Sequence, residues 1–424
     1  MTEANDGLHG FPSPQAEDLH RVPAVWRHFS LFTADHSTDD IRTPPGVYQL
    51  GVACWGRGGL AHAEHGGGGA GFCFIVLETR PGERLPEMIF DQQGDTRFGT
   101  LMVARAGGNA EKELFGRGGD ATINNDHDYA ITAQGGPGGL GQKKRISGIP
   151  ENLIVGGGGG ASGSFYGHGG KGGNAEGFIY VSGETLFCGT SASGGGFGGD
   201  GVSTETGGAA PGGGGACHAA LSQTLSQGGQ PPQIWEPDPG IMNLGLSGAG
   251  GGGTCSAGGN GRIQSSCETL SIGATGGSGL NGRGGLGATE TRPAQDGVAY
   301  YSDDAHSFLA LANQRLGGGG GGGGNADFGD GGQGGPGGGG GGGCAHNKNP
   351  GGGGHGGTGG VGGGGGGAAA VSLVPFRGGD SLFGGGSLGV KNIKPGTCFL
   401  GGGGQGGYLG DPLPASEGCI MLYW

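Results

Sequence analysis

Glycine fills 122 of the 424 positions and occurs in unbroken runs at Gly317 to Gly324, Gly337 to Gly343 and Gly362 to Gly367. A chain so rich in glycine, without a strict three-residue period, is ordinarily disordered. Two features favour a folded chain instead. Short apolar segments with strand-like alternation interrupt the runs, and charged residues are only 13% of the chain, too few for a self-repelling tail. We therefore expect the glycine runs to be ordered.

The state that suits such a run is an extended helix of the polyproline II type. An α-helix is disfavoured because each interior glycine costs about 1 kcal/mol relative to alanine, and a strand of glycine has no side chains to pack. The extended helix rises ~3.1 Å per residue and directs all its backbone groups outward. Because ordering costs about 1 to 2 kcal/mol per residue, many runs must pack together and share hydrogen bonds. The sequence thus predicts a bundle, or sandwich, of polyglycine-II helices.

Composition and charge limit the function classes. Hydrophobic residues are only 33% of the chain, so we expect a small apolar core. The formal net charge of -13 argues against a nucleic-acid partner, and we interpret the basic cluster at Gln142 to Arg145 as a solvated turn. No apolar stretch approaches the ~20 residues of a membrane span, and Met1 to Asp18 lack the regions of a secretion signal. We expect a protein made in the cytoplasm without membrane insertion.

Metal and catalytic motifs are poorly supported. The nine cysteines include no Cys-x-x-Cys pair, so we expect small buried thiols, with Cys255 and Cys267 the pair best placed for a disulfide if one forms. His62 to His65 do not have the spacing of a metalloprotease helix, and Asn124 to Asp128 lack the glycine and terminal glutamate of a calcium loop. We predict no cofactor, no metal and no enzymatic activity.

Strand patterns divide the chain into three parts. Residues 1–28 form a docking segment, residues 29–134 a β-rich region, and residues 135–424 the glycine bundle with variable loops and a closing C-terminal strand. The expected fold class is mainly β and irregular, with few or no α-helices. A small antiparallel sheet with one buried face is expected from four segments: Val47 to Trp55, Phe72 to Leu77, Met88 to Phe90 and Asp95 to Ala104.

Related units recur later in the chain. Gly177 to Val181 with Leu186 to Cys188 form one, and Gly379 to Leu388 form another. The last residues, Cys419 to Trp424, would be an aggregation hazard unless folded, so we expect a terminal strand.

The residues Pro45-Gly-Val47, Trp55-Gly56, Thr96 to Gly99 and Glu417 to Trp424, set among glycine tracts, resemble the glycine-rich domain of bacteriophage tail-fibre and tail-tip proteins. The resemblance covers roughly Phe29 to Trp424. The tracts and variable loops are also similar to the distal tail-fibre adhesins of T-even-like phages, in which a sandwich of polyglycine helices displays receptor-binding loops. The resemblance implies a virion protein of the tail that recognises the host surface and is not an enzyme.

If glycine forms the scaffold, the inserts between the runs carry the specificity, because binding residues tend to lie on loops held by a rigid frame. The candidate receptor-binding residues are aromatic or polar and lie in four inserts: Trp235; Tyr300, Tyr301, His306 and Phe308; Phe328; His346 and Lys348. The alternative for Tyr300, Tyr301 and Phe308 is a small core that caps the glycine slab.

Implied partners are other tail or fibre proteins, through the N-terminal segment, and a bacterial outer-surface protein or glycan. A homotrimer and a single copy on another fibre subunit are both compatible with the sequence. Two other functions stay open. One is a structural virion component whose loops are buried against neighbours. The other is an ice-binding protein, although the inserts here are long and irregular, unlike the short Gly-x-x repeats of glycine-rich antifreeze proteins.

Overall fold

The protein is described by a computed structural model. It describes residues 28–35, 40–62, 65–125, 127–145, 152–155, 159–165, 168–172, 174, 178–182, 185–189, 244–246, 263–265, 282–289, 291–299, 331–334, 369–371 and 417–424. Within these ranges there is no helix, and every pair of neighbouring strands is antiparallel. The described part of the chain is therefore built from antiparallel sheets, as the composition predicts.

Two sheets dominate the N-terminal region. The five-stranded sheet has the order β1-β18-β2-β3-β8, and the four-stranded sheet has the order β4-β5-β6-β7. The strands of the first sheet are β1 (Phe29–Phe32), β18 (Cys419–Tyr423), β2 (Gln49–Trp55), β3 (Phe72–Glu78) and β8 (Ala130–Ala133). Those of the second are β4 (Met88–Phe90), β5 (Thr96–Phe98), β6 (Met102–Ala104) and β7 (Ala121–Ile123).

The remaining strands form small sheets. They are β9 (Gln142–Arg145) and β10 (Asn152–Val155) with β17 (Ala369–Val371); β11 (Phe178–Ser182) with β12 (Thr185–Gly189); β13 (Leu244–Leu246) with β14 (Ile263–Ser265); and β15 (Gly282–Arg283) with β16 (Val298–Ala299). The hairpin β11–β12 confirms the strand pair predicted there. The unit expected at Gly379 to Leu388 lies outside the described residues, as do Cys255 and Cys267.

The C-terminal strand lies inside the first sheet. β18 pairs with β2 through Met421 opposite Ala53, and with β1 through Met421 opposite Leu31. All five of its residues are buried. The apolar end of the chain is thus a central strand, which removes the aggregation hazard that it would present if exposed.

The sheet is buried on both faces, which corrects the expectation of a single buried face. Alternate residues of β2 and β3 point to opposite sides, because successive side chains of a strand do. On one side Trp55, Phe72 and Phe74 pack with Met421. The residues on the other side pack against Met88, Phe98, Met102 and Ala104 of the second sheet; they are Leu50, Val52, Cys54, Cys73, Ile75, Ile420 and Leu422. Apolar residues at nearly every position of these strands match this double burial.

The segment Asp95 to Ala104, expected as one strand, is two. Gly99 has a φ of +52°, which lies in the left-handed region, and Leu101 donates a backbone hydrogen bond to Phe98 at 3.1 Å. The chain therefore turns back, and β5 pairs with β6. The four segments predicted from the sequence accordingly divide between two sheets instead of forming one.

The glycine tracts that follow the strands belong to no strand or helix, yet they are densely hydrogen-bonded. In residues 66–71 the bonds to each neighbouring tract recur every third residue. As donors, the amides of Gly66 and Gly69 bind the carbonyls of Gly139 and Gly136, and the amides of Gly68 and Gly71 bind those of Gly108 and Arg105. As acceptors, the carbonyls of Gly66 and Gly69 bind the amides of Gly116 and Gly119, and the carbonyls of Gly67 and Ala70 bind those of Gly160 and Gly163. The carbonyls of Gly68 and Gly71 bind the amides of Gly59 and Gly56. One tract is thus bonded to five others.

Close approach of these backbones requires glycine. A Cβ atom built on Gly69 would overlap the carbonyl oxygen of Ala161, and one on Gly135 would overlap the carbonyl oxygen of Gly69. Both neighbours are backbone atoms held by their own hydrogen bonds, so neither can move aside cheaply. The described tracts therefore form a slab stabilised by backbone hydrogen bonds, without a large apolar core.

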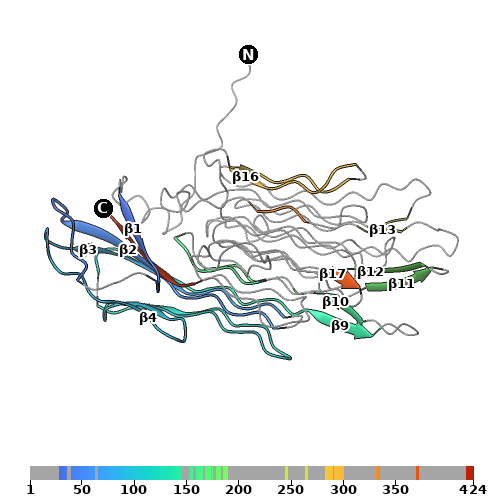
Figure 1. Cartoon of the computed structure of the whole chain (residues 1–424), viewed down its shortest axis with the longest axis horizontal. Helices are drawn as coiled ribbons and strands as arrows, with labels where there is room; N and C mark the ends of the chain where they lie inside the picture. Colours follow the sequence, from blue (N-terminus) through green and yellow to red (C-terminus); the bar gives the residue numbers. More distant parts are fainter. Residues whose placement is uncertain are drawn as a thin grey trace, which may run out of the picture.

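The slab begins directly at the five-stranded sheet, because β2 runs into residues 56–71 and these return into β3. Trp55 Nε1 donates to the carbonyl oxygen of Gly163 at 3.1 Å, and Phe165 packs edge-on against Phe72 with ring centroids 4.8 Å apart. In Figure 1 the large sheet lies at one end of the described part of the chain, and the hairpins β9–β10 and β11–β12 lie towards the other.

The basic cluster Gln142 to Arg145 is a strand, not the solvated turn that we expected. It forms β9, which pairs with β10 so that Lys144 lies opposite Leu153. β9 is the edge of its three-stranded sheet. Lysine and arginine are tolerated on edge strands, where they discourage pairing with further chains. Pairing with the apolar strand β10 therefore outweighs the low strand propensity of the cluster.

Candidate functional site

The eight residues predicted to bind a receptor are Trp235, Tyr300, Tyr301, His306, Phe308, Phe328, His346 and Lys348, and all of them lie outside the described residues. The structure therefore does not bring them together or separate them. It describes two other parts of the molecule with exposed side chains: the short turns where the glycine tracts reverse, and the loops at the opposite end of the large sheet.

The turns at the ends of the tracts are short and tightly bonded. The backbones of His62 and His65 exchange hydrogen bonds of 3.1 and 2.9 Å, and those of Glu111 and Leu114 exchange bonds of 2.8 and 3.3 Å. His62 to His65 is thus a two-residue reversal between tracts. The side chain of Leu114 is 60% exposed, which makes it the most exposed apolar side chain described at this end of the slab.

Polar side chains fix these turns to their neighbours. Asn109 Oδ1 accepts the backbone N–H of Leu60 at 2.8 Å, and Asn174 Oδ1 accepts that of Leu140 at the same distance. Both asparagines occur in the sequence Gly-Gly-Asn-Ala-Glu, and both leucines follow Gly-Gly. His65 Nδ1 accepts the N–H of Gly141 at 3.2 Å. The same asparagine-to-leucine hydrogen bond therefore occurs twice, and it holds adjacent tracts together where their regular bonding ends.

Removing one of these asparagine hydrogen bonds should destabilise the protein modestly. In Asn109→Ala the N–H of Leu60 loses its acceptor, and we expect a loss of about 0.5 to 1.5 kcal/mol in the free energy of unfolding. The midpoint of chemical denaturation measures this loss. Gln92→Ala is the matched control, because it also truncates an exposed amide side chain and should change the midpoint little. Equal midpoints for the two variants would contradict a stabilising role for Asn109.

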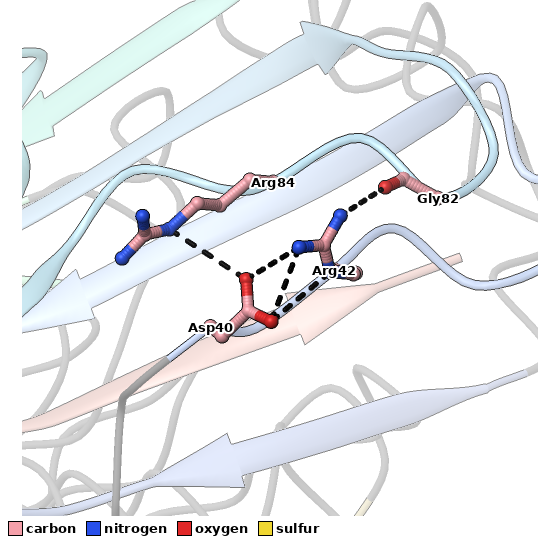
Figure 2. A network of polar contacts seen from close by, with 4 residues as sticks. All are labelled: Asp40, Arg42, Gly82 and Arg84. Atoms are coloured by element: carbon pink, nitrogen blue, oxygen red, sulfur yellow. Dashed lines mark hydrogen bonds and ion pairs between the residues drawn. The ribbon is translucent and has the colours of Figure 1, made fainter.

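At the opposite end of the sheet, three arginines gather on two neighbouring loops. Arg42 donates two hydrogen bonds to the Asp40 carboxylate, with Nη2–Oδ1 and Nε–Oδ2 distances of 2.8 and 3.2 Å. Its Nη1 donates to the carbonyl oxygen of Gly82 at 3.2 Å. Arg84 Nε lies 3.7 Å from the same carboxylate (Figure 2). The third, Arg80, begins the turn that ends at Glu83. None of the three is among the residues that the sequence predicted to form a site.

Three cysteines of the large sheet are buried and structural. Cys54, Cys73 and Cys419 are free thiols with no exposed surface, which confirms the prediction of buried thiols for these three. Burial raises the pKa of Cys54 well above its usual range, and its contacts with Cys73 raise it further. Burial likewise raises the pKa of Cys419. Since the thiolate is the reactive form, these side chains are unsuited to nucleophilic chemistry in the folded state.

One carboxyl group couples the start of β18 to pH. Burial raises the pKa of Glu417, the charge of Asp35 raises it further, and Arg57 partly opposes both. A group with a raised pKa in the folded state stabilises the fold at low pH, and this contribution is lost as pH rises through the folded pKa. Once the pH has risen through this raised pKa, the ionised Glu417 therefore weakens the closure of the sheet.

We accordingly expect Glu417→Gln to raise the melting temperature at neutral pH, with the difference from wild type shrinking as pH falls towards about 4. Thermal unfolding of both proteins across this range tests the expectation. Glu111→Gln, on an exposed turn, is the control and should leave the melting temperature nearly unchanged. A difference that grows as the pH falls would contradict the assigned direction.

Neither a metal site nor a membrane-crossing helix occurs in the described part of the chain. No group of three or more His, Cys, Asp or Glu side chains there is placed to hold a metal ion, and no helix there is long and apolar enough to cross a membrane. In the Asn124 to Asp128 loop, Asn124 Nδ2 donates to the carbonyl oxygen of Thr100 at 2.7 Å, and Asn125 has a φ of +73°. The described residues of this segment are thus irregular, and Asn124 ties them to the loop at Thr100.

Comparison with protein-family models, with curated proteins and with solved structures found no match to this chain.

Proposed function

We propose that this protein is a receptor-binding protein of a bacteriophage tail, in which a slab of polyglycine-II helices displays loops that recognise the host surface. The observation that carries the proposal is the bonding of residues 66–71 to five neighbouring tracts, with bonds to each neighbour three residues apart. Three residues per turn is the repeat of the polyproline II helix, and all-glycine helices of this kind can bond on every side. We extend this arrangement to the glycine runs of residues 135–424.

Such a slab supplies what a recognition protein needs. It is rigid without a large apolar core, so the side chains between the runs are free to specify binding. Turns of two residues, as at His62 to His65 and Glu111 to Leu114, show how little chain is required to reverse a tract. Longer inserts, including those with Trp235 and with Tyr300 to Phe308, then exceed what the scaffold itself requires. Their aromatic side chains suit stacking on sugar rings or apolar protein ridges.

The mechanism is reversible adhesion. Each copy contributes weak loop contacts, and several copies on one virion convert them into firm attachment through their high effective concentration. Residues 1–28 join the protein to another tail or fibre subunit in this scheme, either as a homotrimer or as a single copy. No chemical step is required, so the protein acts without a cofactor.

A cell-binding assay tests the proposal. Fluorescently labelled protein is mixed with candidate host bacteria, and wild type is compared with a variant in which residues 300–308 are replaced by a Gly/Ser segment of equal length. We expect saturable binding of wild type that unlabelled protein competes away, and binding reduced at least tenfold in the variant. Circular dichroism and the melting temperature establish that the variant is folded.

Two results would redirect the assignment. Undiminished binding by the folded variant removes the 300–308 loop from the site. Absence of binding to every host that the parent virion infects, with the protein present in purified virions, favours a purely structural component. Thermal hysteresis of freezing by the purified protein would favour the ice-binding alternative.

A further inference from the structure

Two shallow hollows meet at the end of the large sheet that lies away from the glycine slab. One is lined by Tyr48, Gln49, Glu78, Thr79, Arg80 and Pro81. The other is lined by Leu77, Glu78, Thr79, Glu83, Arg84, Leu85 and Pro86. Because Glu78 and Thr79 belong to both, the hollows form one continuous surface. Its two halves carry an arginine each, Arg80 and Arg84.

The backbone beneath this surface is held in place from both sides. Thr79 N–H donates to the carbonyl oxygen of Tyr48 at 2.9 Å, and the hydroxyls of Thr43 and Thr79 are 2.7 Å apart and buried. Glu83 Oε2 accepts the N–H of Arg80 at 2.8 Å and the hydroxyl of Thr79 at 3.1 Å. Gly82, with a φ of +78°, lets the turn close. The surface is therefore preorganised, which lowers the entropy lost on binding.

An exposed aromatic ring marks the first hollow. Tyr48 is 66% exposed, the largest exposed fraction among the large apolar and aromatic side chains of the described residues. Tyr48 directly precedes β2, whose apolar side chains are fully buried, so the exposure of its ring contrasts with their burial. A ring face presented beside the amide of Gln49 and the carboxylate of Glu78 offers stacking together with both hydrogen-bond donors and acceptors.

The arginines of this surface are differently engaged. Arg42 is neutralised by its two-pronged pairing with Asp40, and the carboxylate of Glu83 is occupied by the turn. Arg80 is exposed and has no ion pair within the described residues. The Arg84 side chain is 72% exposed and reaches Asp40 only at 3.7 Å. In a chain with a net charge of -13, this leaves two exposed guanidinium groups on the same continuous surface as an exposed ring.

We propose that this surface binds a carboxylate-bearing polysaccharide. Tyr48 stacks on the apolar face of a sugar ring, Arg80 binds the carboxylate of that sugar through paired hydrogen bonds, and Arg84 binds a carboxylate further along the chain. Gln49 and Glu78 bind hydroxyl groups between them. A saccharide fits better than an acidic peptide because Glu78, at the junction of the hollows, accepts hydroxyl hydrogens but has nothing to offer a row of carboxylates. This site does not depend on the proposed function, because it lies on the sheet and not on the loops of the slab.

Direct binding of defined oligosaccharides tests the site. The probe is an oligogalacturonate of about six sugars, titrated into the full-length protein by isothermal calorimetry at low salt, beside a neutral oligosaccharide of equal length and an oligoglutamate of equal charge. We expect binding of the oligogalacturonate alone. Arg80→Gln and Tyr48→Ala should each weaken it about tenfold, which corresponds to one charge-assisted hydrogen-bonded contact or one stacking contact.

Matched variants separate a site from general attraction between charges. Tyr48→Phe keeps the ring and should bind as wild type does. Arg117→Gln removes one exposed positive charge from the glycine slab and should also leave binding unchanged. The proposal is overturned if oligogalacturonate does not bind, if Arg117→Gln weakens binding as much as Arg80→Gln, or if oligoglutamate binds as tightly with the same dependence on Arg80.

Discussion

Gly69→Ala should destabilise the folded protein by about 4 kcal/mol or more, a large share of the roughly 5 to 15 kcal/mol that stabilises a typical domain. A single methyl group has this effect because it would overlap the carbonyl oxygen of Ala161, which belongs to the next tract. Gly69 also donates to Gly136 and accepts from Gly119, so a shift that relieves the overlap breaks bonds on two other sides. Chemical denaturation, or the yield of folded protein where none survives, measures the loss.

Gly46→Ala is the matched control for this prediction. The chemical change is the same, but no atom lies within 4 Å of the added Cβ, and the only penalty is the left-handed backbone at a φ of +78°. That penalty is about 1 kcal/mol. If the two variants are equally stable, the tracts are not packed as tightly as the structure has them.

Trp55→Ala is expected to have the second-largest effect, with a loss of about 3 to 5 kcal/mol from the core. The indole is fully buried and packs against Phe72 with ring centroids 4.6 Å apart and against Phe165 at 6.1 Å. It also donates to the carbonyl oxygen of Gly163, which belongs to the slab. The variant therefore both opens a cavity and loosens the sheet from the glycine tracts.

Trp55→Phe separates these two contributions. It keeps most of the ring packing but leaves the Gly163 oxygen without its donor. We expect this variant to lose about 1 to 3 kcal/mol in the free energy of unfolding relative to wild type. We expect faster amide hydrogen exchange in residues 159–165 of this variant than in wild type, and unchanged exchange in the second sheet. A Phe variant as stable and as protected as wild type would show that the indole hydrogen bond does not fasten the slab.

The sequence was sufficient to predict the strands whose residues alternate or are apolar throughout. Val47 to Trp55, Phe72 to Leu77 and Cys419 to Trp424 became β2, β3 and β18. Pairing could not be predicted in the same way. β18 lies between β1 and β2, and alternation tells which side of a strand is buried but not which distant strand is its neighbour.

Other errors have local causes. The turn at Gly99 was hidden because Thr96 to Ala104 contains no proline or paired glycine to mark it. The basic strand β9 was missed because its pattern is polar throughout and its partner β10 supplies the apolar residues. In both cases the tertiary partner decides the conformation, and composition alone does not reveal the partner.

Of the candidate sites, the sequence drew attention to the aromatic inserts of the slab and passed over Tyr48 and Arg80. A signal was present, because each residue lies within two positions of a Pro-Gly turn: Tyr48 follows Pro45-Gly46, and Arg80 precedes Pro81-Gly82. Such turns hold side chains at the surface. What no pattern shows is that the two turns lie together, because the bonds between Thr43 and residues 79–83 connect separate loops.

Mutual backbone hydrogen bonds with a three-residue repeat hold the glycine tracts in order. Amide hydrogen exchange, measured by NMR on protein labelled with ¹⁵N only at glycine, tests this bonding. We expect Gly66, Gly68, Gly69 and Gly71 to exchange as slowly as Gly51 in β2, whereas Gly46, in an exposed turn, exchanges rapidly. Exchange of the four tract glycines at the rate of Gly46 would contradict it.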